Sequence, residues 1–213
     1  MLNLYTRKGI EGSNPSLSAG RRAPLAQLDR ALDYESKGRR FESSRERITS
    51  PDPLDEQFMQ YALKLAREAA GLGEVPVGAV AVKDGVVVGT GLNRREIDRD
   101  PFSHAELVAM QRAAQTLGAW RLIGVTVYVT LEPCAMCAGA MVQGRLSRLV
   151  FGASDPKAGA VGSLYDLARD NRHNHRVEVT SGVLGDECSA VLKDFFRALR
   201  EKNAQAKKSE TTE

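Results

Sequence analysis

Two kinds of segment alternate along residues 51–203, and this alternation constrains the fold more than any other feature of the chain. Short apolar runs rich in valine predict buried strands, and longer segments with apolar residues every three or four positions predict amphipathic helices. Strands are expected at residues 75–82, 86–92, 125–130, 146–151 and 177–180. Helices are expected at residues 55–71, 103–117, 134–143, 164–169 and 186–202. Such an alternation is typical of α/β proteins, in which helices cover a sheet.

The link between the first two apolar runs defines part of the sheet. Lys83-Asp84-Gly85 contains an Asp-Gly pair, which is a strong signal for a tight β-hairpin. At least one pair of strands must therefore be antiparallel. The expected fold class is an α/β, three-layer α/β/α sandwich with a central mixed five-stranded sheet.

Net charge does not indicate a partner for this chain. The 213 residues carry a net charge of +3, but residues 1–50 hold ten Lys and Arg against six Asp and Glu, so the rest is close to neutral. The 42% hydrophobic content excludes collagen-like and strongly disordered classes. We find no apolar run of about 18 residues and no secretory signal, so we expect no membrane span and a cytoplasmic location.

Residues 1–50 have neither helical nor strand periodicity, so no stable structure and no function are expected there. Residues 12–15 and residues 40–43 can be back-translated into the same short nucleotide sequence, which resembles the T-arm of a tRNA gene. The segment resembles the conceptual translation of two tRNA genes, which predicts a non-native extension before the domain at 51–203. The polar residues 204–213 are expected to form a flexible tail.

The cysteines point to metal or redox chemistry rather than to disulfides. Cys134 and Cys137 form a C-x-x-C pair, and Cys188 alone makes the number odd. This usage is typical of a reducing compartment. Cys188 falls within a predicted amphipathic helix, where a free cysteine behaves as a small buried hydrophobe.

His104 and the C-x-x-C pair each fall at the start of a predicted helix, where N–H groups and the helix dipole favour thiolates. His104, Cys134 and Cys137 make a Cys₂His ligand set, which leaves a fourth position open as in catalytic zinc sites. Glu106 lies two residues after His104 and could move protons beside the metal. A redox pair would leave His104 unexplained. A structural site would need a fourth ligand such as His173 or His175, although loop histidines are more often solvated or bound to substrate.

His-Ala-Glu at 104–106, followed by Pro-Cys-Ala-Met-Cys at 133–137, resembles the signature of zinc-dependent nucleobase deaminases. The resemblance extends over about residues 55–200 to the bacterial tRNA-specific adenosine deaminases. The segments that carry it lie at 74–80, 91–94, 130–141, 150–153, 162–164, 174–177 and 194–197.

The resemblance implies a cytidine-deaminase-like fold, a homodimer and one zinc ion per subunit. It also implies that a zinc-activated water converts adenosine to inosine at the wobble position of an arginine tRNA with anticodon ACG, with Glu106 as the proton carrier. The substrate-binding residues that it implies are Val75, Pro76, Asn93, Asp155, Lys157, His175, Phe196 and Arg197.

Within this set, Val75 and Pro76 are expected to line the base pocket, and Asn93 is expected to contact a purine edge. Glu74 is a further candidate partner for polar groups of the nucleotide. The other residues are expected near sugars, phosphates and the anticodon loop of tRNA.

Two other functions compete. A free nucleobase or nucleotide deaminase, acting on cytosine, guanine or dCMP, would share the zinc signature but would not need the Phe-Phe-Arg segment and basic face of the last helix. A zinc-stabilised RNA-binding module without catalysis would not need Glu106.

Overall fold

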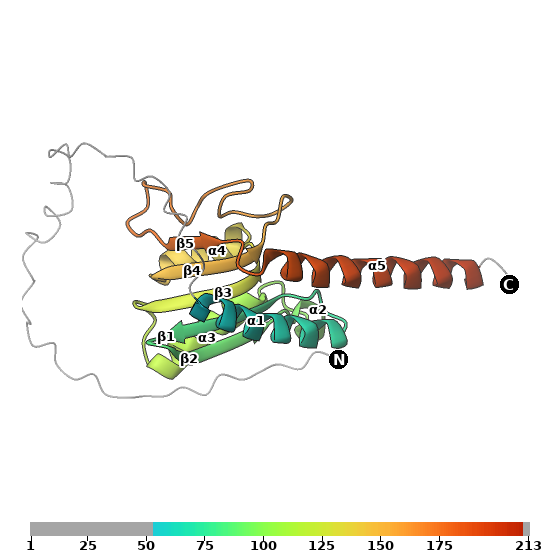
Figure 1. Cartoon of the computed structure of the whole chain (residues 1–213), viewed down its shortest axis with the longest axis horizontal. Helices are drawn as coiled ribbons and strands as arrows, with labels where there is room; N and C mark the ends of the chain where they lie inside the picture. The colour runs from blue at the N-terminus through green and yellow to red at the C-terminus, as the bar shows by residue number, and fades with distance from the viewer. Residues whose placement is uncertain (1–52, 211–213) are drawn as a thin grey trace, which may run out of the picture. The chain divides into compact units, whose positions relative to one another are not determined.

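The computed structural model describes residues 53–210, in which helices and strands alternate (Figure 1). The elements are α1 (Pro53–Gly71), β1 (Gly78–Lys83), β2 (Val86–Leu92), α2 (Arg95–Asp98), α3 (Ala105–Leu117), β3 (Val125–Leu131), α4 (Ala135–Gln143), β4 (Arg148–Ala153), β5 (Glu178–Ser181) and α5 (Gly185–Glu210). The predictions for residues 1–50 lie outside the described residues.

The strands form one five-stranded sheet in the order β2-β1-β3-β4-β5. β1 is antiparallel to both β2 and β3, and Ala79 pairs with Gly91 on one side and with Val129 on the other. β3, β4 and β5 run parallel to one another. The sheet is therefore mixed and five-stranded, as the hairpin and the five apolar runs predicted.

Alternate residues of the strands enter two separate hydrophobic cores, because successive side chains of a strand point to opposite faces. Val127 and Val129 belong to the core that includes α3 and α4. Val80 and Tyr128 belong to the core that includes α1 and the start of α5. Helices thus cover both faces of the sheet, which confirms the three-layer α/β/α arrangement.

Three local predictions were wrong. Residues 164–169 form turns rather than a helix, because Leu164 and Tyr165 are 52% and 60% exposed and present no apolar face to the core. The short helix α2 follows β2, in a segment where no helix was expected. The last helix continues to Glu210 instead of ending near residue 202, since its final segment consists mainly of good helix formers.

Among the residues that the structure describes, no helix has both the length and the hydropathy needed to cross a membrane.

Asp55 forms a buried polar link between α1 and the sheet. Its carboxylate is 2% exposed, accepts two hydrogen bonds of 2.7 Å from the guanidinium of Arg148, and accepts a third of 3.0 Å from the hydroxyl of Tyr128. These bonds join the first turn of α1 to β3 and β4. The ion pair raises the pKa of Arg148, mainly through its hydrogen bonds to Asp55.

We expect Asp55→Ala to lower the free energy of unfolding by about 3 kcal/mol, because it leaves a partly buried guanidinium without its partner. Denaturant unfolding followed by circular dichroism measures the change. Asp166→Ala is the control, since its ion pair with Arg169 is exposed and such pairs contribute at most about 1 kcal/mol. Equal losses in the two variants would contradict the assigned importance of the buried link.

Candidate metal centre and adjoining cavity

The topology brings the ends of four strands to one edge of the sheet. β3 and β4 are parallel and finish at this edge, β2 also finishes there, and β1 starts there because it is antiparallel to both neighbours. Residues just before β1 and just after β2, β3 and β4 therefore lie close together. Ligand sites of open α/β sheets commonly occupy such an edge.

Two glycines of β2 allow α3 to sit directly on the sheet. A Cβ atom at Gly91 would overlap the carbonyl oxygen of Ala105, and one at Gly89 would overlap that of Ala109. Only glycine permits so close an approach of two backbones. This contact fixes the N-terminus of α3, and with it His104, against the edge described above.

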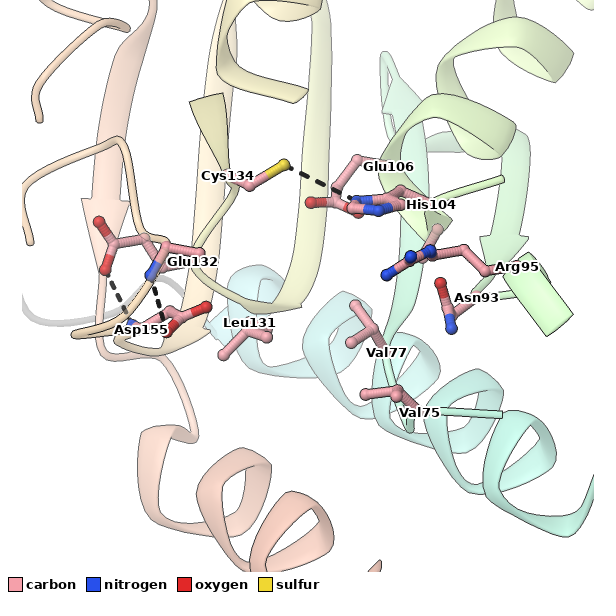
Figure 2. Close-up of a pocket in the computed structure, with 12 residues that line it drawn as sticks. Val75, Val77, Asn93, Arg95, His104, Glu106, Leu131, Glu132, Cys134 and Asp155 are labelled. Atoms are coloured by element: carbon pink, nitrogen blue, oxygen red, sulfur yellow. Dashed lines mark hydrogen bonds between the residues drawn. The ribbon is translucent and has the colours of Figure 1, made fainter. Parts of the chain in front are cut away.

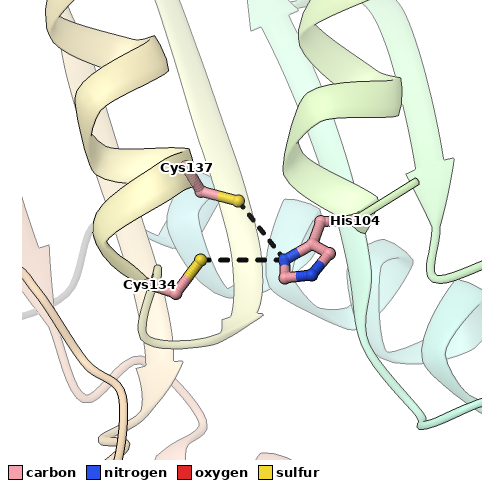
Figure 3. Close-up of side chains that lie close together, drawn as sticks. All are labelled: His104, Cys134 and Cys137. Carbon is pink, nitrogen blue, oxygen red and sulfur yellow. Dashed lines mark hydrogen bonds between the residues drawn. The ribbon is translucent and has the colours of Figure 1, made fainter. Parts of the chain in front are cut away.

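His104, Cys134 and Cys137 converge at the N-termini of two helices (Figure 3). His104 is the N-cap residue of α3, Cys134 is the N-cap residue of α4, and Cys137 lies in the first turn of α4. Nδ1 of His104 lies 3.7 Å from Sγ of Cys134 and 3.5 Å from Sγ of Cys137. Ser103, the residue before this N-cap, has its hydroxyl within hydrogen-bond distance of the carboxylates of Asp98 and Asp100.

The three donors fit a zinc ion in chemistry and in spacing. In a tetrahedral site with Zn–S of about 2.3 Å and Zn–N of about 2.0–2.1 Å, sulfur and nitrogen lie about 3.6 Å apart. The two sulfur–nitrogen distances lie on either side of that value. Thiolate and imidazole ligands favour zinc over magnesium or calcium.

The environment of the two cysteines shifts their pKa values in opposite directions. A hydrogen bond from Cys137 and the neighbouring His104 lower the pKa of Cys134 to about 3, whereas the bond to Cys134 and burial raise the pKa of Cys137. The contact with Cys134 also raises the pKa of His104. A bound metal ion would hold both sulfurs as thiolates, so its binding would release the proton of Cys137.

Glu106 lies in the first turn of α3 and is 4% exposed. Burial raises its pKa above the ordinary value for glutamate. Figure 2 shows its carboxyl group beside His104 and directed toward Cys134. A buried carboxyl with a raised pKa suits a group that takes up and releases a proton during a reaction.

A cavity of about 160 Å³ adjoins the metal-binding group (Figure 2). Empty cavities of about 150 Å³ hold benzene in proteins, so this volume suits a planar ring. Its lining combines apolar walls with a few polar groups and consists of Val75, Val77, Asn93, Arg95, His104, Ala105, Glu106, Leu131, Glu132, Cys134, Asp155 and Ala158.

Val75 and Asn93 line the cavity, as expected for residues that contact the base. Asp155 lines it too, although it was expected near sugars and phosphates. Pro76 does not: it is buried, and Val77 lines the cavity instead. The reason is the alternation of side chains in the extended segment before β1, which turns Val75 and Val77 to one side and Pro76 to the other. Glu74 does not line the cavity either, but its carboxylate accepts a hydrogen bond from the side chain of Asn93.

The remaining predicted contacts lie outside the cavity. Lys157 is exposed on the loop after β4, and Phe196 on α5 is 40% exposed. Arg197 is paired with Asp194 at 2.7 Å. His175 lies just before β5, at the ends of the strands that point away from the cavity. Its Nε2 lies 2.6 Å from the carbonyl oxygen of Leu146. The RNA-binding roles of these residues stay predictions.

Arg95 and Glu132 line the cavity but were missed in the sequence. Glu132 is 3% exposed and accepts hydrogen bonds from the backbone N–H groups of Asp155, Val161 and Ser163 and from the hydroxyl of Ser163. Burial opposes its charge, but these bonds lower its pKa. Glu132 thus fixes the loop after β4. The signal in the sequence was a glutamate at the end of a valine-rich strand.

The mixed sheet between helix layers is that of the cytidine-deaminase-like class of deaminases, and it carries a Cys₂His group placed to bind a metal, with a buried glutamate and a ring-sized cavity beside it. The family model of MafB19-like deaminases matches residues 54–200. The chain belongs to the family of tRNA-specific adenosine deaminases, as its relatives show.

The tRNA-specific adenosine deaminase of Bacillus subtilis is 48% identical over 155 residues, which cover 73% of this chain and 96% of the relative. That of Haemophilus influenzae is 51% identical over 149 residues, which cover 70% and 86%. A structure solved in studies of A-to-I editing by tRNA:A34 deaminases superposes with a TM-score of 0.62 at 43% identity, covering 64% of this chain and 99% of the other.

Proposed function

We propose that this enzyme hydrolytically deaminates adenosine to inosine at the wobble position of tRNA-Arg with anticodon ACG. The observation that supports this most is the buried Glu106 beside both the Cys₂His group and a cavity that suits one ring system. The identity to tRNA-specific adenosine deaminases supports adenosine in tRNA as the substrate.

His104, Cys134 and Cys137 would hold one zinc ion per subunit. When bound there, zinc supplies the Lewis-acid chemistry that makes water a nucleophile near neutral pH. In the overall reaction a C–O bond forms at the amino-bearing carbon of the base, the C–N bond breaks, and ammonia leaves. The Glu106 carboxylate takes a proton from water and delivers it to the leaving amino group. Val75, Val77 and Asn93 orient the base in the cavity.

RNA outside the cavity is proposed to contact Lys157 after β4, His175 before β5, and Phe196 and Arg197 on α5. Asp155 lines the cavity and is proposed to contact a sugar or phosphate next to the base. The exposure of Phe196 supports a role in base stacking. The resemblance also suggests a homodimer, which light scattering during gel filtration tests. The free thiols of the site suit a reducing compartment such as the cytoplasm.

Phe196→Ala should weaken binding of an anticodon hairpin by about 5- to 150-fold, because stacking on an aromatic ring contributes about 1–3 kcal/mol per base. Fluorescence anisotropy with a labelled hairpin measures the change. Leu199→Ala is the matched control, since Leu199 lies on the same helix with almost the same exposure, 41% against 40%, but has no ring to stack. Equal weakening by both variants would argue against stacking.

A second candidate function is deamination of a free base. A guanine deaminase from Nitrosomonas europaea superposes with a TM-score of 0.56 at 27% identity, covering 66% of this chain and 83% of the other. Ammonia release from an anticodon hairpin with A at the first anticodon position, from free guanine and cytosine, and from dCMP separates the two. We expect turnover of the hairpin alone, whereas turnover of a free base without the hairpin would favour the second function.

A further inference from the structure

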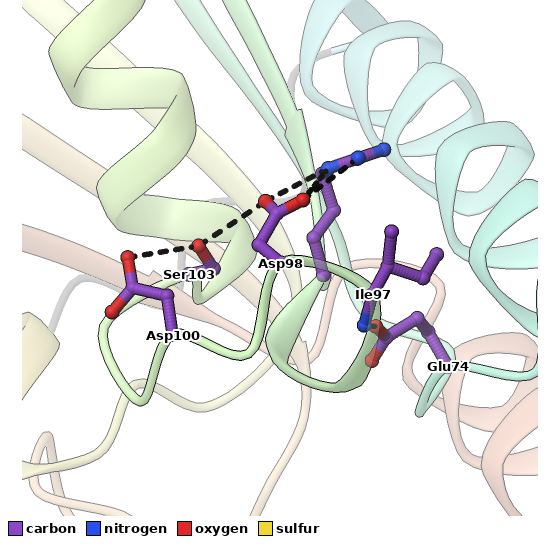
Figure 4. A network of polar contacts seen from close by, with 6 residues as sticks. Glu74, Ile97, Asp98, Asp100 and Ser103 are labelled. Atoms are coloured by element: carbon purple, nitrogen blue, oxygen red, sulfur yellow. Dashed lines mark hydrogen bonds and ion pairs between the residues drawn. The ribbon is translucent and has the colours of Figure 1, made fainter.

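Glu74 is a buried carboxylate that the proposed chemistry does not use. It lies between α1 and β1 and is 1% exposed. One oxygen accepts a 3.0 Å hydrogen bond from Nδ2 of Asn93. The other accepts a 2.8 Å bond from the backbone N–H of Ile97 (Figure 4). Glu74 is absent from the cavity lining, so it acts through the residues that it holds.

The pairing with Glu74 decides which end of the Asn93 amide faces the cavity. Both carboxylate oxygens of Glu74 accept hydrogen bonds, and the bond from Asn93 comes from Nδ2, so the NH₂ group of Asn93 faces Glu74. The oxygen Oδ1 is then left for the cavity, and Figure 2 shows it on the side of Arg95 and His104. A substrate group that meets Asn93 there has to be an N–H or O–H donor.

The bond to Ile97 fixes the wall that carries Arg95. Helix α2 spans only Arg95–Asp98 and has no buried residue, so packing alone does little to hold it. The Glu74 carboxylate anchors one of its backbone N–H groups. The backbone N–H of Asn93 also donates to the carbonyl oxygen of Val77 at 3.0 Å, so the backbone of Asn93 is fixed independently of Glu74.

We propose that Glu74 is a positioning residue for the deamination, because it sets the Asn93 amide with Oδ1 toward the substrate. This inference rests on the proposed function, in which Asn93 orients the base. Glu74 itself touches no reacting atom.

The test inverts the hydrogen-bond polarity without changing shape. In Glu74→Gln, the amide oxygen of the new side chain can still accept the hydrogen bond from the backbone N–H of Ile97, but its NH₂ group now faces Asn93. The Asn93 amide must turn over, which presents Nδ2 to the cavity. We expect kcat/KM on the anticodon hairpin to fall by about tenfold, because the substrate donor then meets an NH₂ group and is left without its acceptor. The thermal midpoint and the zinc content should match the wild type.

The Asn93→Asp exchange provides the rescue. Alone, it places two carboxylates within hydrogen-bond distance and should also lower activity. Combined with Glu74→Gln, the aspartate accepts the bond from the glutamine NH₂ and again presents an oxygen to the cavity. The double variant should therefore be more active than either single variant. Glu96→Gln, an exposed exchange on α2, is the matched control and should leave activity unchanged.

The NMR signal of the Asn93 side-chain NH₂ in the zinc-loaded enzyme gives a readout that does not depend on turnover. It should shift in Glu74→Gln but not in Glu96→Gln. A Glu74→Gln variant with wild-type kcat/KM, or a double variant no better than the worse single variant, would overturn the inference. Failure of the proposed function looks different: the wild type leaves the hairpin unreacted while the Asn93 signal still responds to Glu74.

Discussion

Glu106→Gln should lower kcat on an anticodon hairpin by about 10²–10⁴-fold, because the amide cannot carry the proton and general acid–base catalysis typically contributes that factor. Zinc should stay bound, since Glu106 is not among the three residues that form the metal-binding group. Single-turnover rates and metal analysis are to be made on one preparation.

Glu68→Gln, on the exposed face of α1, is the control for the same exchange and should keep the wild-type rate. A Glu106→Gln enzyme with full zinc and a near-native rate would contradict the proton-carrying role. Loss of zinc from this variant would instead make Glu106 part of the metal site.

Cys137→Ala should abolish measurable deamination together with stoichiometric zinc. Removing an outer partner of a metal ligand costs about 10–100-fold in metal affinity, and the loss of a ligand itself should exceed that range. Zinc is measured by atomic emission after dialysis against a weak chelator, and folding by circular dichroism.

Cys188→Ala is the matched control because Cys188 is also buried, at 1% exposure, but packs between α5 and the sheet away from the metal group. It should retain one zinc ion per chain and full activity. Retention of zinc by Cys137→Ala, or its loss from Cys188→Ala, would contradict the assigned ligand set.

Residues with a local pattern were predictable from the sequence. The valine runs and the Asp-Gly turn defined the strands and the mixed sheet, and the helix-start positions of His104 and Cys134 predicted the metal group. Glu106 was identified because it lies two residues from His104 on the same helix.

Residues whose role depends on the sheet edge were not predictable. Arg95 belonged to a segment with no periodic signal, and its helix is held partly by Glu74, which lies more than twenty positions earlier in the chain. Glu132 accepts hydrogen bonds from backbone N–H groups of the loop after β4. Pro76 and Val77 are neighbours, and only the direction of the extended segment decides which of them faces the cavity.

The most direct test of the proposed activity is to map inosine in full-length tRNA-Arg with anticodon ACG after treatment with the zinc-loaded full chain. Inosine pairs as guanosine during reverse transcription, so sequencing shows the modified position. We predict conversion at the first anticodon position alone, and none when that base is changed to G or when Glu106→Gln is used. An unmodified wobble adenosine, or conversion of other adenosines at a similar rate, would contradict it.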